Sequence, residues 1–556
     1  SYHYSLFFRR LEEAVQAIHE APKLVKDIAL QKPHKPAIDG VDRTKITAKL
    51  LALAKEFQDF HVPETTLKPL NQSQQEAVKE ALRSTFSVIQ GPPGTGKTVT
   101  GAYLAYFFSR INSKLRTGDK RPQVLYCGPS NKAVDVVARY LKKFQKVSVV
   151  RAYGKVIENK AFPVPGERSF MAKWSKNEAD MPPDLQDISL HFRIREPGNP
   201  LAKQIHYWEN RFARFPKLIT EEDIKAYKST VTEAMRIELK QHDIVLSTCN
   251  AAGSFRIQKF TSAMQVIVDE AGMCSEPETM IPLVFNKPKQ VVLIGDHKQL
   301  RSIITEPNAK ALGMDVSLLE KYKDKAKMLT IQYRMHRMIC EFPSSAFYNK
   351  KLQTDRSVTE RSRDPLWRIW PNRGDTPRVF CHVSGREETL SVKSDEGSEM
   401  SKGNRMEIKH VMRIVREMIR RGAKAESIVI LSQYRLQCAN LTDELKTMGA
   451  PFSNIRVSTV VKSQGSEWDY VILSTVRSMP LIEIEQRPSK GWQRRHLGFI
   501  NDENQMNVAL TRARRGLIIV GNMHLLQTHE QWREMINIYR NTGCLKEARE
   551  FLPERS

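Results

Sequence analysis

Several features that define other classes of protein are missing from the sequence. The longest apolar runs, such as MQVIVDE and VVLIG, are far shorter than the ~20 residues that a membrane-spanning helix needs, so we expect no membrane-spanning segment. The seven cysteines are scattered, odd in number and form no CxxC pair. This pattern is typical of reduced thiols in a cytoplasmic or nuclear protein and argues against a zinc site. The chain has no internal repeat and no low-complexity run.

Positive charge is the most unusual feature of the composition. The 556 residues include 88 Lys+Arg and 62 Asp+Glu, a net charge of +26, whereas 40% hydrophobic and 27% charged residues are ordinary for a globular protein. The surplus indicates a polyanionic partner, either nucleic acid or an acidic membrane surface. It is densest in residues 71–150, which hold 13 basic and 4 acidic side chains.

A phosphate-binding motif lies in this basic stretch. The apolar run FSVIQ at 86–90 predicts a strand, and VTGAYLAYFFSRI at 99–111 has the apolar spacing of a helix. Between them stands the pattern G-x-x-x-x-G-K-[ST], formed by Gly91, Pro92, Pro93, Gly94, Thr95, Gly96, Lys97 and Thr98. In this context backbone N–H groups surround phosphates, Lys97 reaches the β and γ phosphates, and Thr98 holds Mg²⁺. We therefore expect ATP and Mg²⁺ as cofactors, and nucleic acid rather than membrane as the polyanion.

Two later strands end in polar residues suited to the same chemistry. The run QVIV ends in Asp269 and Glu270, and a carboxylate at the carboxyl end of a parallel strand lies beside the phosphate loop. We assign Asp269 to Mg²⁺ and Glu270 to general base or water orientation. The run KQVVLIGDHKQL places Asp296 and Gln299 where a γ-phosphate sensor is expected.

Further motifs follow in a set order. They are LNQSQQEAV at 70–78, GPSNKAVD at 128–135, STCN at 247–250, QYRMH at 332–336, LSQYRLQ at 431–437, VSTVVKSQGSE at 457–467 and NVALTRA at 507–513. With this set the chain resembles superfamily 1 helicases of the up-frameshift type, which act in RNA surveillance. The likeness runs from Leu70 to Asn522, and the wording DEAGMCSEPE is closer to the branch that contains helicases with zinc fingers.

The resemblance implies roles for individual residues. Gln74 reads the adenine edge, Glu467 lies near the ribose, and Arg334 and Arg512 act as arginine fingers on the γ-phosphate. The nucleic-acid backbone is held by Ser130, Asn131, Ser247, Thr248 and Thr459. Some positions depart from the family pattern: Val461 and Ser463 replace the usual Asp and Phe of the motif that couples nucleotide to nucleic acid.

The expected fold is α/β, with two RecA-like parallel-sheet domains and a mostly helical insertion. Residues 65–154 and 241–322 form the first RecA-like domain, 155–240 the inserted helical subdomain, 323–556 the second RecA-like domain, and 1–64 a helical stalk. We expect the polar stretch 354–405 to be an irregular excursion.

Three hypotheses follow. The first is an ATP-dependent helicase or translocase, moving 5′ to 3′ on single-stranded nucleic acid, RNA rather than DNA, as a monomer whose flanking regions bind protein partners. The second is an ATP-gated RNA-binding clamp or coactivator scaffold with little unwinding, a reading motivated by Val461 and Ser463. The third, a P-loop kinase or small GTPase, predicts no second domain with arginine fingers, and the motifs through Arg512 disfavour it.

Overall fold

The structure is a computed structural model, and it describes residues 2–32, 49, 52–55, 60, 62, 65–116, 121–164, 181–359, 364–394 and 397–552. The chain forms two compact units. The first contains Ser1–Gly91, Lys97–His297 and Arg301–Leu329, and the second contains Pro92–Gly96, Lys298–Leu300 and Thr330–Ser556. Among the described residues, no helix combines the length and the apolar character that a membrane crossing requires.

The first unit is built on a seven-stranded sheet in the order β3-β4-β2-β5-β6-β1-β7. All of its neighbouring strands are parallel. The strands are β1 (Phe86–Gln90), β2 (Gln123–Gly128), β3 (Val149–Arg151), β4 (Ile244–Thr248), β5 (Ala263–Val268), β6 (Gln290–Gly295) and β7 (Lys327–Met328).

Alternate residues of these strands face two separate hydrophobic cores. In β2, Val124 and Tyr126 join the core under α4, α5 and α6, whereas Leu125 and Cys127 join the core under α2, α11 and α14. A strand buried on both faces reads as a continuous apolar run, which is why these segments show no polar alternation. The helices are α1 (Tyr2–Gln16), α2 (Lys23–Ala29), α4 (Gln72–Arg83), α5 (Lys97–Ser113), α6 (Asn131–Leu141), α7 (Lys155–Ala161), α9 (Leu190–Arg193), α10 (Ala202–Arg214), α11 (Glu221–Gln241), α12 (Cys249–Ala252), α13 (Phe255–Phe260), α14 (Glu276–Asn286), α15 (Pro307–Ala311) and α16 (Leu318–Lys321).

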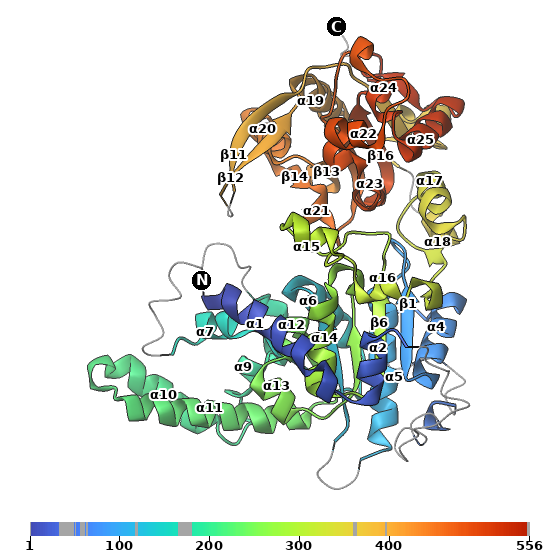
Figure 1. Cartoon of the computed structure of the whole chain (residues 1–556). Helices are drawn as coiled ribbons and strands as arrows, with labels where there is room; N and C mark the ends of the chain where they lie inside the picture. Colours follow the sequence, from blue (N-terminus) through green and yellow to red (C-terminus); the bar gives the residue numbers. More distant parts are fainter. Residues whose placement is uncertain are drawn as a thin grey trace. The chain divides into compact units, whose positions relative to one another are not determined.

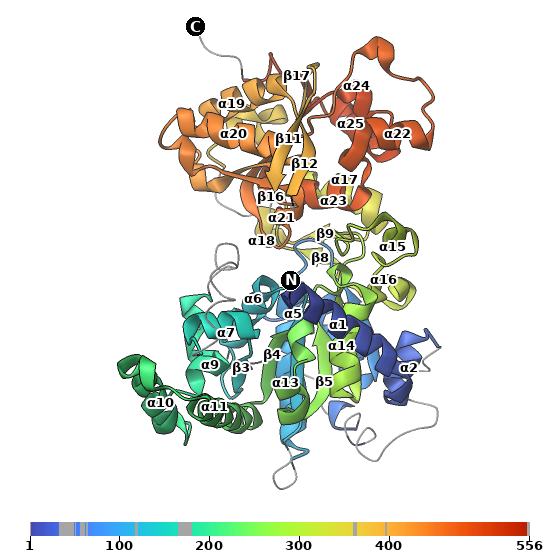
Figure 2. The same ribbon diagram turned by 60° about the vertical axis from the view of Figure 1, so that its left-hand side comes forward.

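The described residues between β3 and β4 are mostly helical. Figures 1 and 2 both show α10 and α11 side by side and extending away from the sheet. A capping box at Thr220 and Asp223 starts α11, and a partly buried ion pair between Arg193 and Glu238 (2.6 Å) ties α9 to the far end of α11.

The amino-terminal helix α1 packs on the first unit. Leu11 and Ala14 are buried against Ile281 of α14, and Arg10 donates to the backbone carbonyl (2.9 Å) and side-chain oxygen (2.7 Å) of Asn250. Most of the later half of the expected helical stalk, from residue 33 to residue 64, lies outside the described residues.

The second unit has a six-stranded parallel sheet in the order β14-β13-β15-β16-β10-β17. Two parallel sheets covered by helices confirm the predicted α/β class. The strands of this sheet are β10 (Arg378–His382), β13 (Ile428–Ser432), β14 (Arg456–Thr459), β15 (Trp468–Ser474), β16 (Ala513–Gly521) and β17 (Leu545–Glu547), and β8 (Ile331–Gln332) pairs separately with β9 (Gln353–Thr354). The helices are α17 (Arg337–Tyr348), α18 (Arg356–Thr359), α19 (Arg405–Arg420), α20 (Arg435–Thr447), α21 (Val460–Ser463), α22 (Lys490–Leu497), α23 (Glu503–Leu510), α24 (Met523–Leu526) and α25 (Glu530–Asn541).

The expectation of an irregular excursion over 354–405 is wrong. The segment RVFCH forms β10, which is fully buried in the sheet between β16 and β17. Residues Glu388–Ser394 (β11) and Gly397–Gly403 (β12) pair as an antiparallel hairpin beside α20 (Figure 1). The buried Trp370 also belongs to the core of this unit, where it stacks on Tyr470. The sequence on both sides of β10 is polar, which concealed this short strand. The hairpin consists of two polar strands, β11 and β12, that pair through their backbones.

Candidate nucleotide and nucleic-acid site

The phosphate-binding motif forms the loop that connects β1 to α5, as its strand–loop–helix context predicts. Gly94 and Gly96 have φ of +76° and +77°, in the left-handed region that residues with a Cβ rarely adopt. Thr95 is fully buried, and its hydroxyl donates to the Pro92 carbonyl at 2.8 Å. The loop therefore has a defined conformation, with Lys97 and Thr98 in the first turn of α5.

The acidic pair lies at the carboxyl end of β5. Glu270 has φ +51°, an uncommon conformation for a residue with a side chain, and its carboxylate lies 3.9 Å from the Lys97 ammonium. Asp269 is 2% exposed. Burial, followed by the neighbouring Glu270 charge, raises the pKa of Asp269 to about 6, although hydrogen bonds from Tyr126 and the Glu270 N–H oppose that rise. Strained backbone, burial and a shifted pKa together are typical of a functional site.

A buried tyrosine positions the Asp269 carboxylate. Tyr126, in the middle of β2, donates its hydroxyl to Oδ2 of Asp269 at 2.9 Å, and the Glu270 N–H donates to Oδ1 at 2.8 Å. The Tyr126 hydroxyl fits because residue 101 in α5 is glycine: a Cβ at Gly101 would lie 2.2 Å from that oxygen. Sequence reasoning missed both residues. Their signals were a hydroxyl inside an apolar strand and a glycine inside a helix, where it costs about 1 kcal/mol.

The donor set fits a divalent cation that prefers oxygen. Asp269 offers a carboxylate whose Oδ2 accepts from Tyr126 and whose Oδ1 accepts from the Glu270 N–H, and each oxygen has a second lone pair. Thr98 supplies a hydroxyl in the first turn of α5. Carboxylate and hydroxyl oxygens are ligands suited to Mg²⁺.

The predicted arginines lie in the second unit, where each has carbonyl or carboxylate partners. Arg334 pairs with Glu467 and donates to the Thr511 carbonyl at 3.1 Å. Burial alone would raise the pKa of Glu467, but the Arg334 guanidinium holds it below its ordinary value. Arg512 is 1% exposed and donates to the carbonyls of Val508 (3.0 Å) and Ser466 (3.2 Å).

The predicted γ-phosphate sensor also groups with these arginines. Gln299 belongs to the short segment Lys298–Leu300 of the second unit, and its side-chain oxygen accepts from Arg512 at 3.4 Å. Asp296, the other candidate, is buried in the first unit and accepts a hydrogen bond from Gln90 at 3.2 Å. The structure thus brings Gln299, Arg334, Glu467 and Arg512 together in one unit, and Lys97, Asp269 and Glu270 in the other.

Gln74 occupies the N3 position of α4. The side-chain oxygen of Gln74 accepts from the backbone N–H of Asn71 at 2.9 Å, and the backbone N–H of Gln74 donates to the side-chain oxygen of Asn71 at 3.0 Å. These two bonds form a capping box. Gln74 is 5% exposed. The reciprocal bonds fix its side chain at the start of α4.

The residues of the first unit that are predicted to contact nucleic acid lie at the carboxyl ends of two neighbouring β-strands. Ser130 caps α6 after β2, and Thr248 ends β4 and caps α12, with Gly128 and Thr248 in register. Asn131 begins α6. Ser247 is fully buried and donates its hydroxyl to the Thr248 carbonyl, so its side chain does not reach the surface of this edge.

A buried arginine that sequence reasoning missed holds this edge. Arg151 of β3 is fully buried, donates to Asp135 at 2.9 Å and to the side-chain oxygen of Asn131 at 2.8 Å, and lies over the Tyr153 ring. Tyr153 also donates to Asp135 at 3.0 Å. The Arg151 guanidinium, which is paired with Asp135 and lies over the Tyr153 ring, therefore orients the Asn131 side chain.

Thr459 has the corresponding position in the second unit. It ends β14, and its side-chain oxygen accepts from the Lys462 N–H, which caps α21. Thr459 and Ser474 are both in register with Ser432, so the ends of β14, β13 and β15 lie along one edge of the sheet.

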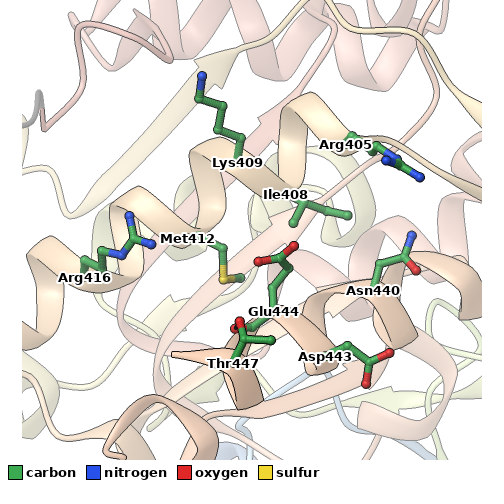
Figure 3. A pocket seen from close by; sticks show the side chains of 9 residues that line it. All are labelled: Arg405, Ile408, Lys409, Met412, Arg416, Asn440, Asp443, Glu444 and Thr447. Atoms are coloured by element: carbon green, nitrogen blue, oxygen red, sulfur yellow. Dashed lines mark hydrogen bonds between the residues drawn. The ribbon is translucent and has the colours of Figure 1, made fainter. Parts of the chain in front are cut away.

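A groove of about 510 Å³ lies elsewhere in the second unit, between α19 and α20. Figure 3 shows Ile408, Met412 and Glu444 turned toward the space between the helices, whereas Lys409 points away from them. No predicted site residue lines it; its lining is Arg405, Ile408, Lys409, Met412, Arg416, Asn440, Asp443, Glu444 and Thr447.

The fold and the phosphate loop define the class of protein. A glycine loop between a buried parallel strand and a helix, with a lysine beside carboxylates at the end of another strand of the same sheet, is the arrangement of a P-loop nucleoside triphosphatase. Two family models, each described as an AAA domain, match residues 69–307 and 314–524.

Curated relatives narrow this class. The chain is 41% identical over 541 residues to 3′-5′ exoribonuclease HELZ2 of Homo sapiens, which covers 95% of this chain and 18% of that protein. It is 33% identical to a regulator of nonsense transcripts 1 homolog of Neurospora crassa (88% of this chain, 40% of that protein). It is 31% identical to ATP-dependent helicase NAM7 of Saccharomyces cerevisiae (88% and 45%).

The chain belongs to the superfamily 1 helicases of the up-frameshift type, and the resemblance that its motifs indicate is confirmed. The likeness to helicases with zinc fingers is borne out by HELZ2. The chain spans less than half the length of each of these three relatives.

Proposed function

We propose that this chain is an ATP-dependent helicase or translocase that moves 5′ to 3′ along single-stranded nucleic acid, RNA in preference to DNA. The observation that carries the proposal is the catalytic cluster of the first unit, in which Lys97 and Glu270 lie 3.9 Å apart beside the buried Asp269. A net charge of +26 supports a polyanionic track. In this proposal the chain acts as a monomer in the cytoplasm or nucleus, and the regions that flank it bind protein partners.

Each part of the site has a role in phosphoryl transfer to water. The loop from Gly91 to Gly96 holds the phosphates of ATP with its backbone N–H groups, and Lys97 neutralises the β and γ phosphates. Thr98 and Asp269 hold Mg²⁺, which offsets the charge that develops on the leaving phosphate. Glu270 orients the attacking water and accepts its proton.

Residues of the second unit complete the reaction. Arg334 and Arg512 stabilise the charge on the γ-phosphate, Gln299 senses that phosphate, Glu467 lies near the ribose, and Gln74 of the first unit reads adenine. Arg334 pairs with Glu467, and a γ-phosphate would replace that carboxylate as the partner of the guanidinium. Hydrolysis then depends on nucleotide-driven exchange of ion pairs.

The single strand of nucleic acid is held at the carboxyl ends of parallel β-strands. Ser130, Asn131 and Thr248 of the first unit and Thr459 of the second cap helices at these ends, where hydroxyl and amide groups reach phosphate oxygens. Such contacts place the backbone without reading sequence.

A clamp with little unwinding is the second candidate. Val461 and Ser463 of α21 replace the usual Asp and Phe, and the Ser463 hydroxyl is buried against the Val460 carbonyl at 2.6 Å. Neither residue offers a charge that links nucleotide to strand.

Unwinding of matched duplexes separates these candidates. Two substrates with the same sequence, one RNA and one DNA, carry a single-stranded tail at either the 5′ or the 3′ end. A helicase displaces the strand of the 5′-tailed RNA with ATP, and Glu270→Gln abolishes this activity. ATPase stimulated by RNA without strand displacement would favour the clamp, and equal rates on DNA would refute the RNA preference.

A further inference from the structure

An exposed aromatic ring and a basic helix stand at the edge of the second sheet, outside every motif assigned above. The helix is α22, and the ring is Phe499 in the short turn Gly498–Asn501 that follows it. Phe499 is 52% exposed. Residues 486–501 hold four Lys or Arg and no carboxylate. Large exposed aromatic rings beside cations are typical of sites that bind single strands.

The backbone of this turn is fixed against the strand ends. Gly498 has φ +56°, and a Cβ there would lie 2.8 Å from both the Tyr434 hydroxyl and a guanidinium nitrogen of Arg477. Tyr434 donates to the Leu497 carbonyl at 3.3 Å, and Arg477 donates to the Arg495 carbonyl at 3.1 Å. Tyr434 follows β13 and Arg477 follows β15, so both strand ends hold the carboxyl end of α22.

Phe499 is consequently a supported ring and not a loose side chain. Its ring lies 5.7 Å from the Tyr434 ring, between centroids, and Tyr434 is 5% exposed. The next residue, Ile500, is buried, and its carbonyl accepts from the Trp532 indole at 3.1 Å. A ring with one face or edge supported and half of its area in solvent can stack a base at little cost in side-chain entropy.

The helix that precedes the ring carries the cations. Lys490, Arg494 and Arg495 are exposed, and none forms an ion pair within the part of the chain that the structure describes. Lys490 and Arg494 are four residues apart and share one face of α22. Their charge is therefore available to phosphates.

This surface adjoins the proposed strand contact of the same unit. Thr459, at the end of β14, is in register with Ser432 of β13, which is in register with Ser474 of β15. Neighbouring β-strands are about 4.8 Å apart, so the ends of all three β-strands lie within about 10 Å. A single strand of nucleic acid that contacts Thr459 and follows these β-strand ends would pass toward Tyr434 and Phe499.

We propose that Phe499 stacks a base of the bound single strand and that Lys490, Arg494 and Arg495 hold the flanking phosphates. This inference rests on the proposed function, because it assigns a further contact to the same substrate. Stacking on a ring does not distinguish uracil from thymine, so the contact serves RNA and DNA alike.

Equilibrium binding tests the proposal. Fluorescence anisotropy of labelled oligouridylate and oligothymidylate is measured with the full chain, without nucleotide. Loss of a stacked base weakens binding about 5- to 150-fold. Phe499→Ala should show that loss on both oligonucleotides, whereas Phe499→Trp should bind both with the affinity of the unaltered chain. Phe255→Ala, which removes an exposed aromatic ring (65% exposed) of the first unit, is the matched control and should leave binding unchanged.

Charge variants test the second half. A triple change of Lys490, Arg494 and Arg495 to Gln should make the slope of log affinity against log salt shallower by about 2. The control changes Arg540, Lys546 and Arg549 to Gln, which removes the same charge from other exposed positions of the unit. Equal effects of the two triples, or wild-type binding by Phe499→Ala, would overturn the inference while strand binding by the unaltered chain stands. Failure of the unaltered chain to bind either oligonucleotide would instead refute the proposed function.

Discussion

The hydrogen bond from Tyr126 to Asp269 gives a quantitative prediction about Mg²⁺. Tyr126→Phe removes only the hydroxyl that donates to Oδ2 at 2.9 Å, and Asp269 keeps the Glu270 N–H at 2.8 Å. Loss of an outer partner of a metal ligand typically lowers metal affinity about 10- to 100-fold. This corresponds to about 1.4–2.7 kcal/mol, in the range for a hydrogen bond to a charged group.

A change on the neighbouring helix should have the same effect. A Cβ at residue 101 would lie 2.2 Å from the Tyr126 hydroxyl, 3.1 Å from its ring carbon and 3.2 Å from a methyl of Ile294. Gly101→Ala therefore displaces the hydroxyl from Asp269. In the Tyr126→Phe background the nearest atoms are the two at 3.1–3.2 Å, which a shift of a few tenths of an ångström relieves. The double variant should thus resemble Tyr126→Phe alone, a coupling of about 1–3 kcal/mol.

The assay is the Mg²⁺ concentration that half-saturates binding of a fluorescent ADP analogue, with binding in EDTA as the reference. Tyr126→Phe and Gly101→Ala should each raise that concentration about tenfold or more and leave binding in EDTA unchanged. Tyr103→Phe is the matched control, because it removes another buried hydroxyl, one that donates to the Lys68 carbonyl at 3.0 Å. Wild-type Mg²⁺ dependence in Tyr126→Phe, or a double variant whose loss is the product of the single losses, would refute the reasoning.

Three further predictions follow from buried charge and from the composition. Burial raises the pKa of Glu407 to about 8, so the carboxyl is protonated in the folded chain at neutral pH. The stability that the protonated carboxyl contributes is full below about pH 4.5 and is lost as the pH rises through 8. Glu407→Gln should therefore reduce the change in melting temperature between pH 6 and pH 9, and an unchanged pH dependence would contradict this prediction. Arg151→Gln leaves Asp135 without its buried partner and releases Asn131, so the first unit should lose about 3–5 kcal/mol of unfolding free energy by calorimetry, and Arg151→Gln with Asp135→Asn should lose less; equal losses would contradict the ion-pair account. Affinity for oligouridylate should fall at least tenfold between 50 and 200 mM salt, and affinity insensitive to salt would contradict a phosphate track.

The parts of the site that sequence reasoning located are local in the chain. The phosphate loop and the Asp269–Glu270 pair each depend on a few consecutive residues whose type and order determine the geometry. Consecutive apolar runs likewise predicted parallel strands buried on both faces. These features required no knowledge of distant contacts.

The parts that were missed depend on contacts between distant segments. Tyr126 meets Asp269 across 143 positions, and the fit needs Gly101 on a third element. The strand RVFCH was hidden among polar neighbours, because only three of its five residues are apolar and its place in the sheet depends on β16 and β17, which flank it. Sequence signals for such contacts exist, as in the helix-interior glycine, but they do not name the partner.

The central claim is that a strand of nucleic acid drives ATP hydrolysis by the cluster of Lys97, Asp269 and Glu270. Release of phosphate is measured for the unaltered chain and for Glu270→Gln, with and without oligouridylate, alongside binding of a fluorescent ATP analogue. We predict hydrolysis that oligouridylate stimulates in the unaltered chain, and undiminished nucleotide binding with hydrolysis lowered at least a hundredfold in Glu270→Gln. Normal turnover by Glu270→Gln, or hydrolysis that no single strand stimulates, would contradict the account.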